Sequence, residues 1–249
     1  MRLFANAPGA IKAMSSLRLL KDYKRGIAQA LKEGDQEKER ENILKATSTW
    51  GKHMIKKFGA TLDVQGRENL PTEGPVVYIS NHQGYADIIA LCAALDTVQF
   101  GFVAKKELAE IPIYGHWITD IRSVLIERDN PRESIKAISR GINYINEGFS
   151  LLIFPEGTRS KGPEMGEFKK GALKLATKPK VPIIPVSINN TWKCFEEEGK
   201  MKGADVRMII HPPIPTDNLT KEEERDLSDV VENIVREGVA RLQSEDVNV

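Results

Sequence analysis

Residues 76–87 read VVYISNHQGYAD, a short apolar segment followed by a polar loop and by an apolar run that begins near Asp87. A short apolar run bounded by turn residues is typical of a buried strand, and we expect the run after Asp87 to form a helix. In α/β folds, ligands commonly bind beyond the carboxyl ends of the strands. The loop after Ser80 therefore indicates both the fold class and the place of a site.

The same alternation of strand, loop and helix continues from residue 60 onward. Strands are predicted over 61–66, 76–80, 100–104, 124–127, 151–154, 183–188 and 206–210. Helices are predicted over 88–95, 131–147, 169–177 and 220–244. This alternation predicts an α/β fold with a mixed, mainly parallel sheet flanked by helices.

Two amphipathic helices are predicted before the first strand, as an N-terminal appendage. Residues 1–30 hold six basic side chains and one acidic one. From Ile11 to Leu31, apolar residues fall largely three or four positions apart. A second helix follows Asp35 and ends before Gly59. Such a basic amphipathic helix either lies on an anionic membrane surface or packs its apolar face on its own domain.

The composition excludes several classes of protein. The 249 residues include 36 basic and 35 acidic side chains, a balance that argues against a protein built to coat nucleic acid. The two cysteines, Cys92 and Cys194, cannot make a disulfide scaffold and fit a reducing compartment. The longest apolar run, 88–95, is far shorter than the roughly 20 residues of a transmembrane helix, and no secretory signal is recognised. We therefore expect a cytoplasmic origin.

His82 and Asp87 are the first candidates for chemistry. With His82 in the loop and Asp87 in the first turn of the helix, the loop can fold the carboxylate against the imidazole. Such a contact fixes the tautomer of the histidine and favours the imidazolium that forms when it takes a proton. The alternative is a solvent-facing histidine beside an aspartate that caps the helix.

A second polar loop, FPEGTRS at residues 154–160, again follows an apolar strand. Gly157 permits a tight turn, and Thr158 and Arg159 offer hydrogen-bond donors to an anion. The planar fork of Arg159 suits a phosphate because it bonds two oxygens at once. Glu156 is expected to orient Arg159 or to accept a hydrogen bond from a substrate hydroxyl. A polar turn without a ligand is the alternative.

Two further cations follow other predicted strands. Lys105 stands after the strand at 100–104, and Arg128 lies just beyond the strand at 124–127. We expect them to converge with Arg159 on one anion-binding cleft, although surface solvation explains each of them singly. The sequence has no HExxH, CxxC, P-loop, GxGxxG or GxSxG motif, so no metal ligand is predicted.

Taken in order, four blocks resemble the motif blocks of the lysophospholipid acyltransferase family, which includes the bacterial 1-acyl-sn-glycerol-3-phosphate acyltransferases. The blocks are NHQGYAD at 81–87, KKELAEIPIYG at 105–115 leading to IERDN at 126–130, FPEGTRS at 154–160 and VPIIPVSI at 181–188. The resemblance covers roughly residues 60–215. Its most specific part is the HxxxxD block followed by FPEGTRS at this separation.

The resemblance implies a role for each candidate residue. His82 is then the general base, and Asp87 is its orienting partner. The positions that match phosphate contacts are Lys105, Arg128 and Arg159. The acceptor-binding turn consists of Glu156, Gly157 and Thr158. Backbone N–H groups of the 81–87 loop or of the start of the following helix are candidates for stabilising the oxyanion that forms in the reaction.

The implied reaction is direct transfer of a fatty acyl group to the sn-2 hydroxyl of 1-acyl-sn-glycerol 3-phosphate, or lysophosphatidic acid, giving phosphatidic acid. The donor is an acyl-CoA or acyl carrier protein thioester, and no cofactor is implied. Glycerol 3-phosphate or another lysolipid is the alternative acceptor. A non-catalytic module that binds lysolipid is a more remote alternative.

The resemblance also bears on location and domain organisation. Many relatives begin with a transmembrane span, which this sequence lacks, so monotopic or peripheral attachment to the cytoplasmic face of a membrane is expected instead. Residues 1–58 are then the amphipathic, membrane-associating region, and residues 59–249 are the acyltransferase domain. The expected partners are a membrane surface, the acyl donor and lysophosphatidic acid, with no nucleic acid.

Overall fold

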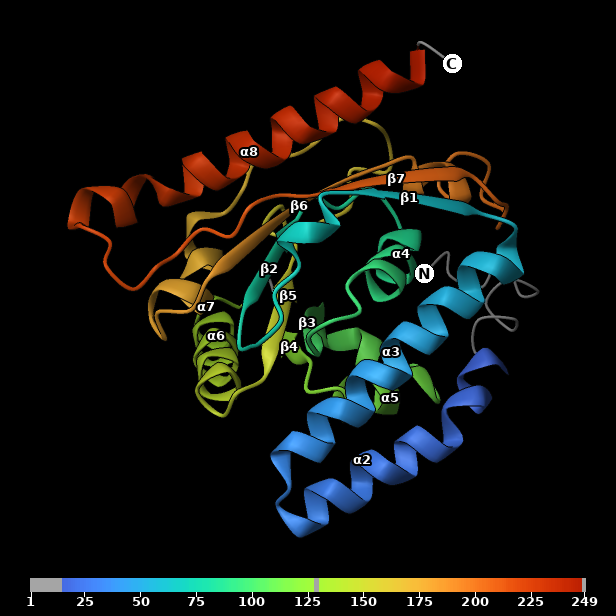
Figure 1. Cartoon of the computed structure of the whole chain (residues 1–249), viewed down its shortest axis with the longest axis vertical. Helices are drawn as coiled ribbons and strands as arrows, with labels where there is room; N and C mark the ends of the chain where they lie inside the picture. Colours follow the sequence, from blue (N-terminus) through green and yellow to red (C-terminus); the bar gives the residue numbers. More distant parts are fainter. Residues whose placement is uncertain (1–14, 128–129, 248–249) are drawn as a thin grey trace.

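The computed structural model describes residues 15–127 and 130–247. The strands within these ranges are β1 (Thr61–Gln65), β2 (Val77–Ser80), β3 (Phe100–Lys105), β4 (Val124–Ile126), β5 (Ser150–Ile153), β6 (Ile183–Asn189) and β7 (Asp205–Ile210). They form one sheet in the order β1-β7-β6-β2-β5-β3-β4, in which all neighbours are parallel except β6 and β7 (Figure 1). The predicted mixed, mainly parallel sheet is confirmed, and each predicted strand forms with an end shifted by one residue at most.

The α-helices of the described residues are α2 (Lys21–Glu33), α3 (Gln36–Phe58), α4 (Ala86–Ala94), α5 (Tyr114–Asp120), α6 (Pro131–Asn146), α7 (Lys174–Thr177) and α8 (Lys221–Val247). Short 3-10 turns are η1 (Leu17–Leu20), η2 (Arg67–Asn69), η3 (Lys106–Glu110), η4 (Lys170–Leu173) and η5 (Thr191–Cys194). The helix predicted over 169–177 is divided into η4 and α7. The sequence did not predict α5, because two helical turns are too short to display a clear period.

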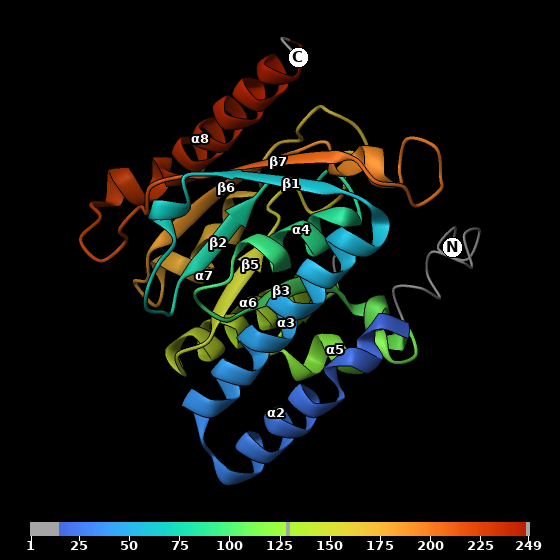
Figure 2. The ribbon, with the colours of Figure 1, turned by 45° about the vertical axis from the view of Figure 1, so that its right-hand side comes forward.

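Side chains of the central strands alternate between two cores, one on each face of the sheet. Tyr78 and Leu152 belong to the core that also includes residues of α3, α4 and α5. Val77, Ile79 and Leu151 belong to the other core, which includes residues of α6 and α8. Figures 1 and 2 show these two sets of helices on opposite sides of the sheet. A sheet covered on both faces requires this period of two.

The N-terminal helices pack into the first of these cores. Ile43, Trp50 and Met54 of α3 are buried there, as the predicted apolar face requires. Gly51 approaches α4 so closely that a Cβ added to it would lie 2.4 Å from the backbone nitrogen of Ala93. The apolar face of α3 is therefore covered by the protein's own domain, which leaves the outer faces of the helix pair for any other contact.

An ion pair and an exposed leucine refine the prediction for this region. Glu39 of α3 is buried and accepts hydrogen bonds from Nε and Nη2 of Arg122 over 2.6 and 2.8 Å. Leu31, expected on the apolar face of α2, is 57% exposed, because Ile27 and Ala30 take the buried positions of the last turns. The boundary between residues 58 and 59 stays a prediction, but α3 contributes to the main core.

Three adjacent parallel strands bring polar loops to one edge of the sheet. β2 lies between β6 and β5, with Tyr78 opposite Ile184 on one side and Leu152 on the other. Because parallel strands end at the same edge, the loops that follow β2, β5 and β6 meet there. Two of these loops contain the NHQGYAD and FPEGTRS blocks.

Candidate active site

Backbone hydrogen bonds join the loops that follow β2 and β5. The N–H of Ser160 donates to the carbonyl oxygen of His82 over 2.8 Å, and the N–H of Lys161 donates to that of Gln83 over 3.0 Å. These bonds hold the NHQGYAD and FPEGTRS segments side by side. The two blocks, far apart in the sequence, are therefore neighbours at one edge of the sheet.

His82 and Asp87 make the contact that their spacing predicts. Nδ1 of His82 lies 2.6 Å from Oδ2 of Asp87, which also accepts a hydrogen bond from the N–H of Gly84 over 2.9 Å. The hydroxyl of Thr191 donates to the other oxygen, Oδ1. Asp87 is fully buried, and the His82 side chain is only 14% exposed. The alternative of a solvent-facing histidine is therefore wrong.

The imidazole of His82 is held on one face as well as at its edge. Its ring stacks on Phe154, with the centroids 3.9 Å apart and the planes 12° from parallel. Because an ionised carboxylate only accepts hydrogen bonds, Nδ1 of the neutral ring carries the proton toward Asp87. The other ring nitrogen, Nε2, is then the one with a lone pair, and it is the nitrogen that can accept a proton from a substrate.

Glu156 holds backbone rather than Arg159. Its Oε1 accepts from the N–H of His82 over 2.6 Å, and its Oε2 accepts from the N–H of Gly166 over 2.8 Å. Burial raises the pKa of this carboxyl group, an effect that the two N–H donors oppose. The expectation that Glu156 orients Arg159 is wrong in this structure, because both oxygens already bind the loops around the histidine.

Arg159 instead pairs with Glu196, a residue that the sequence did not single out. Nη1 of Arg159 donates to Oε1 of Glu196 over 2.7 Å, and the guanidinium lies over the ring of Tyr85, 3.6 Å from its centroid. The same Oε1 accepts a hydrogen bond from the N–H of Tyr85 over 3.0 Å. Burial raises the pKa of Glu196, although Tyr85 and Arg159 partly offset this effect. Arg159, the candidate residue for binding an anion, is thus held at a defined position.

The remaining predicted residues are placed less centrally. Gly157 occupies a turn with φ at +71°, and Thr158 is exposed. Lys105 ends β3, which β5 separates from β2, and its ammonium pairs with Glu107 over 2.9 Å. The expected convergence of Lys105 with Arg159 is therefore not seen as a contact. Arg128 lies outside the described residues.

The loop after β6 contributes two residues that the sequence analysis missed. Thr191 binds Asp87, and Glu196 binds Arg159, so this loop contacts both halves of the site. Both residues follow the fourth motif block, which ends at Ile188. The available signal was a polar run, NNT at 189–191, after an apolar strand. That is the same pattern that identified the first two loops.

Two structural features are absent from the described residues. Within 15–127 and 130–247, no group of three or more His, Cys, Asp and Glu side chains is arranged to hold a metal ion. Among the helices of the same ranges, none has both the length and the apolar character needed to cross a membrane.

Comparisons with known proteins give a consistent result. A model of the protein family described as Acyltransferase matches residues 61–189. A chloroplastic 1-acyl-sn-glycerol-3-phosphate acyltransferase from Brassica napus, BAT2, is 38% identical over 168 residues, which are 66% of this chain and 48% of that protein. The chain thus matches about half the length of this plant relative.

Two bacterial proteins match over most of their length. A 1-acyl-sn-glycerol-3-phosphate acyltransferase from Salmonella typhimurium is 30% identical over 210 residues, 81% of this chain and 83% of that protein. The crystal structure of the 1-acyl-sn-glycerophosphate (LPA) acyltransferase PlsC from Thermotoga maritima superimposes with a TM-score of 0.74. It is 28% identical and covers 98% of each chain, so the similarity includes the N-terminal helices.

Proposed function

The chain belongs to the Acyltransferase family, and on that premise we propose that it moves a fatty acyl group from an acyl thioester to the sn-2 hydroxyl of 1-acyl-sn-glycerol 3-phosphate. The product is phosphatidic acid. The observation that carries the proposal is the buried His82–Asp87 pair in the loop that also supplies Tyr85, the residue under the Arg159 guanidinium. A base for a hydroxyl and a cation for a phosphate are thereby adjacent.

The proposed chemistry is a direct transfer. Nε2 of His82 accepts the proton of the acceptor hydroxyl as the hydroxyl oxygen attacks the thioester carbonyl carbon. The tetrahedral intermediate then collapses, the C–S bond breaks, and the thiolate leaves with the proton from His82. Asp87 stabilises the imidazolium between these steps and keeps the ring in the required tautomer. The proposed route requires no covalent acyl-enzyme and uses no metal or redox cofactor.

The structure narrows the choice of oxyanion donors. In the 81–87 loop, the N–H of His82 donates to Glu156, that of Gly84 to Asp87 and that of Tyr85 to Glu196. These three groups are occupied by protein carboxylates, which keeps the loop in place around the histidine. The expectation that this loop supplies oxyanion donors therefore does not hold for these three N–H groups.

The phosphate of the acceptor is assigned to Arg159. A guanidinium has five N–H donors, and the bond to Glu196 uses one of them. The side chain is 23% exposed, so it can be reached from solvent. We further propose that Lys105 and Arg128 add positive charge and that Gly157 and Thr158 border the acceptor.

Thiol release from acyl-CoA on addition of lysophosphatidic acid tests the proposed activity. Wild type and His82→Ala are compared side by side, with glycerol 3-phosphate as a second acceptor and acyl carrier protein thioester as a second donor. Acceptor-dependent release that the variant lacks supports the proposal. Thiol release with glycerol 3-phosphate but not with lysophosphatidic acid would identify glycerol 3-phosphate as the acceptor. No release with any donor and acceptor pair would refute the proposed enzymatic activity.

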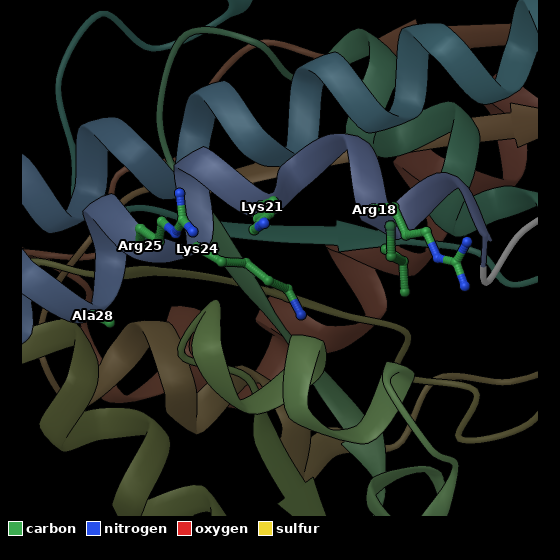
Figure 3. A pocket seen from close by; sticks show the side chains of 6 residues that line it. Arg18, Lys21, Lys24, Arg25 and Ala28 are labelled. Atoms are coloured by element: carbon green, nitrogen blue, oxygen red, sulfur yellow. The ribbon is translucent and has the colours of Figure 1, made fainter.

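We also propose that the outer face of the N-terminal helices binds the cytoplasmic face of a membrane. An open hollow of about 510 Å³ is lined by Leu17, Arg18, Lys21, Lys24, Arg25 and Ala28 (Figure 3). Leu19 and Leu31 nearby in the sequence are 54% and 57% exposed. Basic side chains together with exposed leucines favour an anionic lipid surface, to which the cations are attracted and into which the leucines insert.

Flotation with vesicles containing anionic lipid tests this attachment. The triple variant Arg18→Glu, Lys21→Glu and Arg25→Glu should lose flotation and leave thiol release from soluble substrates intact. The matched control changes three exposed lysines of α7 and the residues beside it, Lys174, Lys178 and Lys180. Equal flotation of wild type and the first variant would rule out the basic face. Point variants are preferable to deletion of residues 1–58, because α3 packs into the core.

A further inference from the structure

Glu196 lies in the segment after β6, beyond the stretch 61–189 that matches the Acyltransferase family. We propose that Glu196 is a positioning residue for the acceptor's phosphate: its carboxylate holds the Arg159 guanidinium against the ring of Tyr85, in the position where phosphate meets it. The inference deepens the proposed function and rests on it. Glu196 acts through Arg159 and need not touch the substrate.

Three contacts define the position of the guanidinium. Nη1 of Arg159 lies 2.7 Å from Oε1 of Glu196, and the guanidinium carbon lies 3.6 Å from the centroid of the Tyr85 ring. The N–H of Tyr85 donates to the same Oε1 over 3.0 Å. One carboxylate oxygen therefore binds both the backbone of Tyr85 and the guanidinium that lies over its ring. An arginine side chain has high rotamer entropy, and ordering it before the ligand arrives removes that cost from binding.

The carboxylate of Glu196 is buried inside the protein. Its side chain is 4% exposed, and Oε2 is buried without a hydrogen-bond partner. Gly84 leaves the space that Oε2 occupies, since a Cβ added to Gly84 would lie 2.4 Å from that atom. The loop that contains His82 therefore has a glycine at the position where any larger side chain would collide with the carboxylate of Glu196.

The uneven use of the two oxygens predicts which substitution preserves the function. Both hydrogen bonds fall on Oε1, and Oε2 makes none, so the amide of Glu196→Gln can place its oxygen at the first position and its NH₂ at the second. The shorter Glu196→Asp cannot reach both donors, and Glu196→Ala provides no acceptor. A residue that held only the fold would not show this order.

The test measures the KM for lysophosphatidic acid and kcat in the wild type and in Glu196→Ala, Glu196→Gln and Glu196→Asp. We expect KM to rise about tenfold in Glu196→Ala, the value for one side chain that must be ordered on binding, with kcat within about twofold. Glu196→Asp should behave like Glu196→Ala, and Glu196→Gln should stay within about threefold of wild type, because the hydrogen-bonded oxygen is kept. Melting temperatures report whether each variant is folded.

The outcomes separate the two proposals. A wild type that does not use lysophosphatidic acid refutes the proposed function. An active wild type with an unchanged KM in Glu196→Ala refutes only the role of Glu196. A parallel loss of kcat in the alanine and glutamine variants also refutes it, because a defect in the fold or in the histidine pair would do the same. If Glu196→Ala does not fold, the comparison of Glu196→Gln with Glu196→Asp carries the test.

Discussion

Two buried carboxylates organise the two halves of the site in different ways. Asp87 holds the imidazole of His82, and Glu196 holds the guanidinium of Arg159, over 2.6 and 2.7 Å. Each also accepts a backbone N–H from the same loop, that of Gly84 in the first half and of the next residue in the second. Both oxygens of Asp87 have partners, whereas Oε2 of Glu196 has none.

The difference follows from what each half is proposed to do. The histidine half contains a proton acceptor, whose ring must keep one tautomer and one orientation through the reaction, and a carboxylate bound on every side provides that. The arginine half contains a ligand-binding group, which must be ordered and yet keep donors for the phosphate. A single hydrogen bond, donated by Arg159 to one carboxylate oxygen, orients the guanidinium and leaves most of its N–H groups available.

The largest effect is expected from His82→Ala. Removal of a general base typically lowers kcat by about 10³-fold, and the KM for the acceptor should change little because Arg159 is untouched. Acceptor-dependent thiol release measures both parameters. Activity above a few per cent of wild type would contradict the assignment of the base and would make the two halves less distinct.

Arg159→Ala should give the opposite pattern. The KM for lysophosphatidic acid is expected to rise by about 10- to 100-fold, the value of charge-assisted hydrogen bonds to one phosphate, with a smaller change in kcat. Monoacylglycerol with the same acyl chain is the control acceptor, since it has no phosphate. An equal loss with both acceptors would show that Arg159 supports the fold or the histidine half instead.

Thr191→Val probes the third ligand of Asp87. The substitution keeps the shape of the side chain and removes the hydroxyl that binds Oδ1, which leaves a fully buried carboxylate oxygen without that donor. We expect kcat to fall about tenfold with KM unchanged, since a hydrogen bond to a charged group is worth about 1.5–3 kcal/mol. Thr191→Ser should restore most of the rate, and failure to do so would indicate a packing defect.

Gly84→Ala couples the two halves. A Cβ at this position crowds Oε2 of Glu196, the end of a side chain that can shift at some strain. The KM for lysophosphatidic acid should rise about threefold, less than in Arg159→Ala, because the guanidinium is displaced rather than removed. Combining Gly84→Ala with Glu196→Ala should give no further rise in KM beyond that of Glu196→Ala alone, because the atom that the added Cβ crowds is then absent. An additive effect would show that Gly84 acts elsewhere.

A second histidine pair provides a contrast without a carboxylate. Nε2 of His211 lies 2.7 Å from the Ser187 hydroxyl, and burial lowers the pKa of His211 to about 4. The unfolded chain therefore binds a proton between about pH 6.5 and 4 that the native protein does not, so stability falls as the pH decreases through this window. Chemical denaturation at pH 7 and 4.5 should show a smaller loss in His211→Gln than in wild type, with kcat unchanged at pH 7.

Much of this arrangement could be predicted from local sequence patterns. The strands show as short apolar runs, and His82 and Asp87 lie five residues apart on one loop, so their contact depends mainly on local geometry. Glu196 and Thr191 are 37 and 104 residues from the groups they bind. Their roles could not be predicted from local sequence because they depend on the pairing of β6 with β2. Arg128, which both its position after an apolar strand and the family resemblance predict as a phosphate contact, lies outside the described residues.

What covers the apolar face of α3 could not be predicted from the sequence for a similar reason. Its amphipathic pattern indicates that one face is covered but does not indicate by what. Glu39 is buried because Arg122, 83 residues later, supplies a bidentate partner. Likewise, the spacing predicts Leu31 on the apolar face, but the turn at which α2 leaves the core is a tertiary property, and Leu31 is exposed.

The close approach of α3 to α4 has a mechanical consequence. Gly51 rests on the backbone of Ala93, and Asp87 lies in the first turn of the same helix, α4. A bilayer that bears on the N-terminal pair would thus be connected to the histidine pair by two helices in backbone contact. His82 and Asp87 would be held at a constant height above the lipid, and an acceptor lipid would reach them by diffusing in two dimensions instead of three.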